Sequence, residues 1–114
     1  MKKFLLITVF AVVTAFVANA QGKFITFKDT NFTKAAIAFG VDKNKDGKID
    51  TAEASSIKYL DVSWKSITDI SGVEYFYNLD TLDCYGNLLT SIDVSKNKKL
   101  YSLVCGGNAL TALD

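Results

Sequence analysis

The sequence has 114 residues, with 13 lysines, 12 carboxylates, no arginine, no histidine and no proline, and its formal net charge is +1. Without arginine, the chain has no guanidinium fork for phosphate or guanine, so nucleic-acid binding is not expected. Without histidine, serine-protease-type triads and most zinc sites are excluded.

Residues 1–20 have the pattern of a secretory signal peptide. Lys2 and Lys3 precede an apolar stretch from Phe4 to Val17, and Ala18-Asn19-Ala20 supplies small residues at a cleavage site. The apolar stretch is shorter than a membrane span requires. We therefore expect cleavage before Gln21, no membrane span afterwards, and a protein that is secreted or held at the cell surface. The alternative is an uncleaved amino-terminal anchor.

Residues 21–56 are expected to form a small cap. Phe32, Ala35, Ala36 and Phe39 recur at helical spacing, polar residues at 29–31 can cap the helix, and Gly40 can end it. A second, shorter helix is predicted over residues 51–57. Residues 23–27 alternate in polarity and predict a short strand, whose partner the sequence does not identify.

Between these helices, residues 42–53 have the spacing of a calcium-binding loop. Oxygen ligands are expected at loop positions 1, 3, 5, 7, 9 and 12, with Gly47 at position 6 making the sharp turn. The predicted metal ligands are Asp42, Asn44, Asp46, the carbonyl of Lys48, Asp50 and Glu53. Such hard oxygen ligands favour Ca²⁺ over Mg²⁺ or Zn²⁺. The alternative is a solvated loop of mixed charge that binds no ion.

The charge of this loop bears on its role. Lys43, Lys45 and Lys48 stand among four carboxylates, so the loop carries little net negative charge. We expect weak affinity, with Kd of about 10⁻⁴ to 10⁻³ M, which secreted compartments can still saturate. A structural calcium site is favoured over a signalling switch.

Residues 57–114 contain a repeat that becomes visible when the chain is shifted by 21 positions. Leu79, Leu82, Cys84, Asn87 and Leu89 recur as Leu100, Leu103, Cys105, Asn108 and Leu110, and a looser copy begins at Ile57. This is the leucine-rich-repeat pattern, with the last repeat incomplete. The predicted fold is an α/β solenoid of 21–22-residue repeats with short parallel strands, preceded by a small helical EF-hand-like cap.

Within each repeat, alternation along the strand separates an inward from an outward row. Leu60, Leu82 and Leu103 should point inward, as should Cys84 and Cys105. The two cysteines could form a disulfide, but neighbouring parallel strands hold Cβ atoms farther apart than a disulfide prefers, so two buried thiols are favoured.

The outward row lies on the concave face and is the predicted ligand surface. Its candidate ligand-binding residues are Tyr59, Asp61, Thr81, Asp83 and Tyr85. Asp61 and Asp83 should be neighbours, which is unfavourable for like charges unless a lysine, a cation or a ligand lies between them. A solvated pair is the simpler alternative.

The chain from Phe27 to Asp114 resembles secreted bacterial leucine-rich-repeat proteins whose amino-terminal cap carries a single EF-hand-like loop. The resemblance includes Asp-Gly-Lys-Ile-Asp at 46–50, Gly-Val-Glu-Tyr-Phe at 72–76 and Leu-Thr-Ser-Ile-Asp at 89–93. It implies protein binding or adhesion at the cell surface and no catalysis.

The expected function is therefore a secreted, non-enzymatic binding or adhesion module, with a protein or a surface glycan as its ligand. One alternative is a purely structural cap fragment of a larger surface protein. Another is a calcium-dependent docking module similar to dockerins, although dockerins usually carry two such loops and this chain has one.

Overall fold

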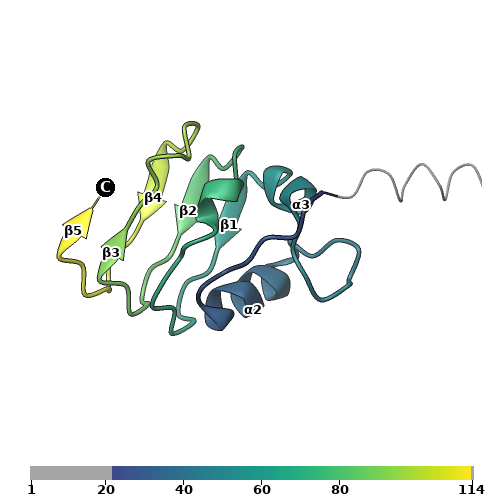
Figure 1. The fold of residues 1–114 in the computed structure, drawn as a ribbon. Coiled ribbons are helices and arrows are strands. Elements are labelled where there is room, and N and C mark those ends of the chain that lie inside the picture. Colours follow the sequence, from purple (N-terminus) through teal and green to yellow (C-terminus); the bar gives the residue numbers. More distant parts are fainter. Residues whose placement is uncertain (1–21, 114) are drawn as a thin grey trace, which may run out of the picture.

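A computed structural model of the chain describes residues 22–113, so the predicted signal peptide lies outside the described residues. Two helices, α2 and α3, lie at one end of a row of short strands (Figure 1). In chain order the elements are α2 (Thr30–Phe39), α3 (Thr51–Ser55), β1 (Tyr59–Asp61), the 3-10 helix η1 (Val73–Tyr75), β2 (Thr81–Asp83), β3 (Ser91–Ile92), β4 (Ser102–Val104) and β5 (Ala112–Leu113).

Helix α2 begins two residues earlier than the apolar spacing alone predicted. The carboxylate of Asp29 caps it by accepting a hydrogen bond from the backbone N–H of Asn31 at 2.8 Å. The helix ends at Gly40, whose φ of 111° lies in the left-handed region that glycine adopts without strain. Phe32, Ala35 and Ala36 are buried, as their spacing predicted.

The segment predicted as a strand near the amino terminus pairs with the end of the 42–53 loop. Phe24 and Asp50 form an antiparallel bridge. Ile25 donates a backbone hydrogen bond to Ile49, and Thr51 donates one to Lys23. Residues 23–25 thus satisfy the backbone groups at 49–51 that the sequence left without an identified partner.

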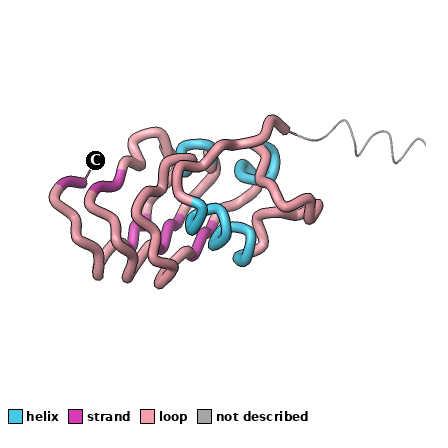
Figure 2. The backbone as a smooth tube through the Cα atoms, turned by 60° about the horizontal axis from the view of Figure 1, so that its bottom comes forward, coloured by secondary structure: helices cyan, strands magenta, loops and turns pink. Residues whose placement is uncertain are grey.

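The repeats build a parallel three-stranded sheet in the order β1-β2-β4, and β3 and β5 form a second parallel pair (Figure 2). Leu60 is in register with Leu82, and Leu82 with Leu103. This register confirms that the strands of successive repeats lie side by side with equivalent residues aligned.

One continuous core joins the helices to the repeats. The strand leucines Leu60 and Leu82 are fully buried, and Phe32 of α2 packs against Phe76 of the first repeat with ring centroids 6.4 Å apart. Leu103, in β4, is only partly buried. Phe76 therefore seals the cap against the repeats, whereas its neighbours Tyr75 and Tyr77 remain exposed.

Recurring asparagines hold successive repeats together, Asn87 from a buried position and Asn108 from a partly buried one. The Asn87 side chain accepts hydrogen bonds from the backbone of Lys65 and Ile67, and donates to the carbonyls of Val62 and Cys84. Asn108 bonds the next repeat in the same way, to Leu89 and Cys84 among others. Each amide replaces strand hydrogen bonds that the tight turn cannot make.

Candidate functional site

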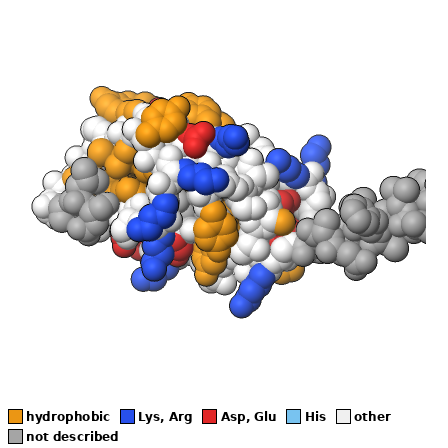
Figure 3. Space-filling view, turned by 90° about the horizontal axis from the view of Figure 1, so that it is seen from above, with side chains coloured by type: hydrophobic (Ala, Val, Ile, Leu, Met, Phe, Trp, Pro, Cys, Tyr) orange, Lys and Arg blue, Asp and Glu red, His pale blue; other side chains and the backbone are white. Residues whose placement is uncertain are grey.

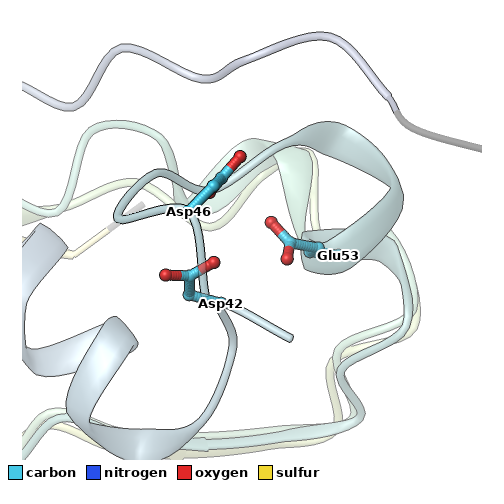
Figure 4. Close-up of side chains that lie close together, drawn as sticks. All are labelled: Asp42, Asp46 and Glu53. Carbon is cyan, nitrogen blue, oxygen red and sulfur yellow. The ribbon is translucent and has the colours of Figure 1, made fainter. Parts of the chain in front are cut away.

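The loop between α2 and α3 brings three carboxylates together. Asp42 and Asp46 come from the loop itself and Glu53 from α3, and one oxygen of each lies within 4.8 Å of the others (Figure 4). Gly47, with a φ of 81°, makes the turn that returns the chain toward Asp42. The sequence spacing therefore predicted a real convergence of side chains.

Backbone N–H groups supply the hydrogen bonds that these carboxylates accept from the described residues. Glu53 accepts from Lys43 at 2.8 Å and from Asp50 at 3.1 Å, and Asp42 accepts from Gly47 at 2.9 Å. Asp42 and Glu53 are nonetheless at least nine-tenths buried. Buried negative charges of this kind are unfavourable unless a positive charge compensates them.

One oxygen of the site has no partner. The Oδ1 atom of Asp42 is buried and makes no hydrogen bond with the described residues, while its Oδ2 accepts from Gly47. A buried acceptor left unpaired costs free energy. A hard divalent cation such as Ca²⁺ would satisfy this oxygen and offset the charge of the three carboxylates, so the residues present fit that ion.

The other predicted ligands have visible local roles. Asn44 accepts a hydrogen bond from the N–H of Asp46, and Asp50 caps α3 by accepting from the N–H of Glu53 at 2.8 Å. Asp50 is not one of the three converging carboxylates. The side chain of Lys48 places its Nζ 4.9 Å from the centre of the Phe24 ring. A contact of Asn44, Asp50 or the Lys48 carbonyl with a metal stays a prediction.

The predicted ligand surface is assembled as the alternation indicated. Tyr59 is in register with Thr81, and Asp61 with Asp83. Tyr59 and Tyr85 are 48 % and 41 % exposed, so part of each side chain is accessible from the surface. Asp61 and Asp83 are therefore neighbours on adjacent strands, with Val104 next to Asp83 on β4.

Two aromatic residues were misjudged or missed at the level of sequence. Phe39 was counted on the apolar face of α2, but it is 39 % exposed and meets the ring of Tyr59 edge to face at 5.7 Å. Trp64 was not recognised as a surface residue, yet it is 71 % exposed and contacts the ring of Tyr85 at 5.3 Å. The sequence signal that could have identified Trp64 was its alignment in the repeat with Gly86 and Gly107, because a bulky side chain is unusual at a position that otherwise holds glycine.

The two cysteines occupy equivalent positions on neighbouring repeats and are free thiols. Cys84 is fully buried and Cys105 partly so. Burial, with smaller effects from Cys105 and Asp83, raises the pKa of Cys84 to about 12. This thiol therefore behaves as a small apolar side chain of the core.

A polar hollow of about 360 Å³ lies away from both candidate sites, between the segments that precede β2 and β4. Its lining residues are Thr68, Asp69, Ile70, Ser71, Glu74, Thr90, Ser91, Asp93 and Lys96. None of them belongs to the predicted metal or ligand residues.

Hydrophobic and charged side chains are distributed unevenly over the surface. Hydrophobic side chains gather along one margin of the molecule seen from above, while lysine side chains lie across the middle of this face (Figure 3). Within residues 22–113, no helix is long and apolar enough to cross a membrane.

Comparison with protein-family models and with curated proteins found no match. Solved structures do match. The functional domain of InlJ from Listeria monocytogenes is 33 % identical over 82 % of this chain and 22 % of that chain, with a TM-score of 0.69. An internalin from the same species, InlF, is 30 % identical over 75 % of this chain and 26 % of that chain, with a TM-score of 0.65.

A third similar structure comes from Clostridium perfringens ZmpB and contains CBM51-2, in complex with GlcNAc, and INT domains. It is 28 % identical over 72 % of this chain and 17 % of that chain, with a TM-score of 0.62. The chain thus spans about a sixth to a quarter of the length of these structures. These similarities show that the chain is like bacterial internalins and has a fold of the leucine-rich-repeat type.

Proposed function

We propose that the protein is a secreted or surface-held, non-enzymatic binding module, in which a calcium-stabilised, EF-hand-like cap precedes a leucine-rich-repeat solenoid. The observation that carries this proposal is the register of the parallel sheet. It aligns Tyr59 with Thr81 and Asp61 with Asp83 on one face and leaves both Tyr59 and Tyr85 exposed. Aromatic side chains in such positions often dominate binding free energy.

The comparisons support a binding role. Two similar structures are internalins, and the third contains a domain in complex with GlcNAc. A protein or a surface glycan is therefore the proposed ligand, and the row Tyr59, Asp61, Thr81, Asp83 and Tyr85 is the proposed contact surface. Secretion is proposed from residues 1–20, whose composition matches a signal peptide.

The proposed role of calcium is structural. The support comes from the buried, unpartnered Oδ1 of Asp42 and from its convergence with Asp46 and Glu53. These three side chains would hold the ion, and Asn44, Asp50 and the carbonyl of Lys48 would complete the ligands. The ion would supply positive charge that fixes the loop between α2 and α3.

The two cysteines also resemble a feature of the InlJ structure. The InlJ structure includes a cysteine ladder, and Cys84 and Cys105 here occupy equivalent positions in successive repeats. We propose a two-rung ladder of free thiols that fills the core between β2 and β4. Its function would be packing and not metal binding, because the described chain places no third ligand beside the pair.

Binding can be tested with panels of extracellular proteins and surface glycans displayed at equal density. For any ligand found, Tyr85→Ala and Tyr59→Ala should each raise Kd by more than about fivefold, or about 1 kcal/mol, because they remove exposed aromatic contacts. Lys98→Ala, at an exposed residue outside this row, is the control and should leave Kd unchanged.

Binding that is insensitive to both tyrosine changes but lost with Lys98→Ala would refute the assigned face. Failure to bind any member of either panel would argue against a binding module and for a structural fragment.

A further inference from the structure

Trp64 occupies a backbone conformation that the repeat otherwise gives to glycine. Its φ is 56°, and the residues at the same place in the next two repeats are Gly86, with φ 70°, and Gly107, with φ 65°. A bulky side chain in the left-handed region is strained. The indole gains little burial in return, because it is 71 % exposed. Burial therefore does not account for tryptophan at this turn, and strain of this kind is a recognised mark of functional positions.

The rings of Trp64 and Tyr85 form a continuous shelf, here named the aromatic ledge. A Cβ atom added to Gly86 would lie 2.5 Å from atoms of the Trp64 indole, so that ring lies directly over the glycine. The ring of Tyr85 lies over the next repeat in the same way, 3.0 Å from a Cβ added to Gly106. The two rings meet edge to face at 5.3 Å. Glycine at these places thus leaves room for both rings on the surface.

Two carboxylates lie close in the chain to the two residues of the ledge. Asp83 accepts a hydrogen bond from the N–H of Tyr85 at 3.0 Å, and Asp61 accepts from the N–H and hydroxyl of Ser63, the residue before Trp64. Both carboxylates bond through Oδ1, and no described residue donates a hydrogen bond to either Oδ2. Hydrogen bonds from Ser63, and to a smaller degree the charge of Lys65, hold the pKa of Asp61 below its ordinary value.

We propose that the aromatic ledge and the Asp61–Asp83 pair form a site for a basic polypeptide segment, whose arginine or lysine side chain lies between the carboxylates and against the rings. This inference rests on the proposed binding function and specifies its ligand. Aligned like charges are unfavourable without a cation, and the faces of tryptophan and tyrosine attract one. A guanidinium also stacks on aromatic rings. An uncharged glycan would stack on the ledge but would add no positive charge beside the two aligned carboxylates.

Trp64 is the single tryptophan of the chain, so its fluorescence reports on the ledge alone. The probes are a short glycine–serine peptide with two arginines, the same peptide with citrulline in place of arginine, and an uncharged oligosaccharide of N-acetylglucosamine. The arginine peptide should change the fluorescence saturably, and less so as salt is added. The citrulline peptide should bind at least about fivefold more weakly, because it lacks the positive charge.

The carboxylates are tested by Asp61→Asn and Asp83→Asn, which keep an oxygen to accept the local hydrogen bonds. Each change should weaken binding of the arginine peptide about fivefold. Asp93→Asn is a matched control, because Asp93 bonds the N–H and hydroxyl of Ser95 as Asp61 bonds those of Ser63. This control should leave affinity unchanged.

Equal binding of the two peptides, or arginine-peptide binding that survives both aspartate changes, would overturn the inference. Saturable binding of the oligosaccharide without the arginine peptide would also overturn it, while leaving the proposed binding function intact. If no probe alters the fluorescence, the inference fails, and the proposed function is then judged separately by the Tyr85→Ala test on the panels.

Discussion

The carboxylate of Asp29 connects the cap to the repeats by bonding Thr68, 39 residues later in the chain. Its Oδ2 accepts from the backbone N–H of Thr68 at 2.7 Å and from the hydroxyl at 3.0 Å, while its Oδ1 caps α2. One side chain therefore fixes both the start of a helix and its position on the first repeat. Asn31 adds a second link by donating to the carbonyl of Ser66.

This arrangement predicts a dependence of stability on pH. Burial acts to raise the pKa of Asp29, but hydrogen bonds from Thr68, Asn31 and Asp69 outweigh it, so the pKa lies below the ordinary 3.8. The ionised carboxylate thus stabilises the fold above pH 3.8, and this contribution is lost as the pH falls through the lower folded-state pKa. Urea unfolding at several pH values measures the free energy of unfolding, which should fall in acid for the wild type. Asp29→Asn should make this fall smaller. Asp80→Asn, at a carboxylate that accepts no hydrogen bond from the described residues, should not.

Calcium is predicted to stabilise the native protein. Binding to the folded state alone contributes RT ln(1 + [Ca²⁺]/Kd), or about 2.7 kcal/mol at a hundredfold excess over Kd. Thermal melts in millimolar calcium and in chelator should therefore differ for the wild type. Asp46→Asn retains an acceptor for the N–H of Lys48 but removes one charge, so it should shrink this difference. The proposed site would be refuted if the wild-type melting midpoint were the same in calcium and in chelator. It would also be refuted if Asp93→Asn reduced the calcium-dependent difference as much as Asp46→Asn does.

The buried amide of Asn87 should be among the most important polar side chains of the repeats. Asn87→Ala would leave the N–H groups of Lys65 and Ile67 and the carbonyls of Val62 and Cys84 without these partners. We expect a loss of about 2–4 kcal/mol in the free energy of unfolding. Asn108→Ala should cost less, because that side chain is only partly buried and water can reach its partners. Denaturant unfolding of the two variants measures the difference, and the reverse order would contradict this account.

The thiols should differ in reactivity. With a pKa of about 12, Cys84 carries almost no thiolate at pH 8, and it is fully buried, whereas Cys105 is partly accessible. An alkylating reagent at pH 8 should therefore modify Cys105 first in the native protein and both cysteines after unfolding. Peptide mass analysis gives the order of modification. Recovery of a Cys84–Cys105 disulfide without added oxidant would show that the free-thiol ladder is wrong.

Much of this fold could be read from local spacing. The interval between Asp42 and Glu53 set the loop, and the recurrence of Leu82 and Asn87 at 103 and 108 set the repeat and its register. Such features follow from the sequence alone because helix and strand geometry converts a fixed spacing along the chain into a fixed direction in space.

Other features required the tertiary structure. The pairing of residues 23–25 with 49–51 and the clamp of Asp29 on Thr68 join segments more than twenty residues apart, and no periodicity marks them. The repeat aligns Trp64 with Gly86, but it does not show that the indole lies on that glycine. Trp64 is the clearest case, because alternation along the strand would direct its side chain inward with Val62. The left-handed turn directs the indole instead onto the glycine of the next repeat, and only the packing of neighbouring repeats determines that outcome.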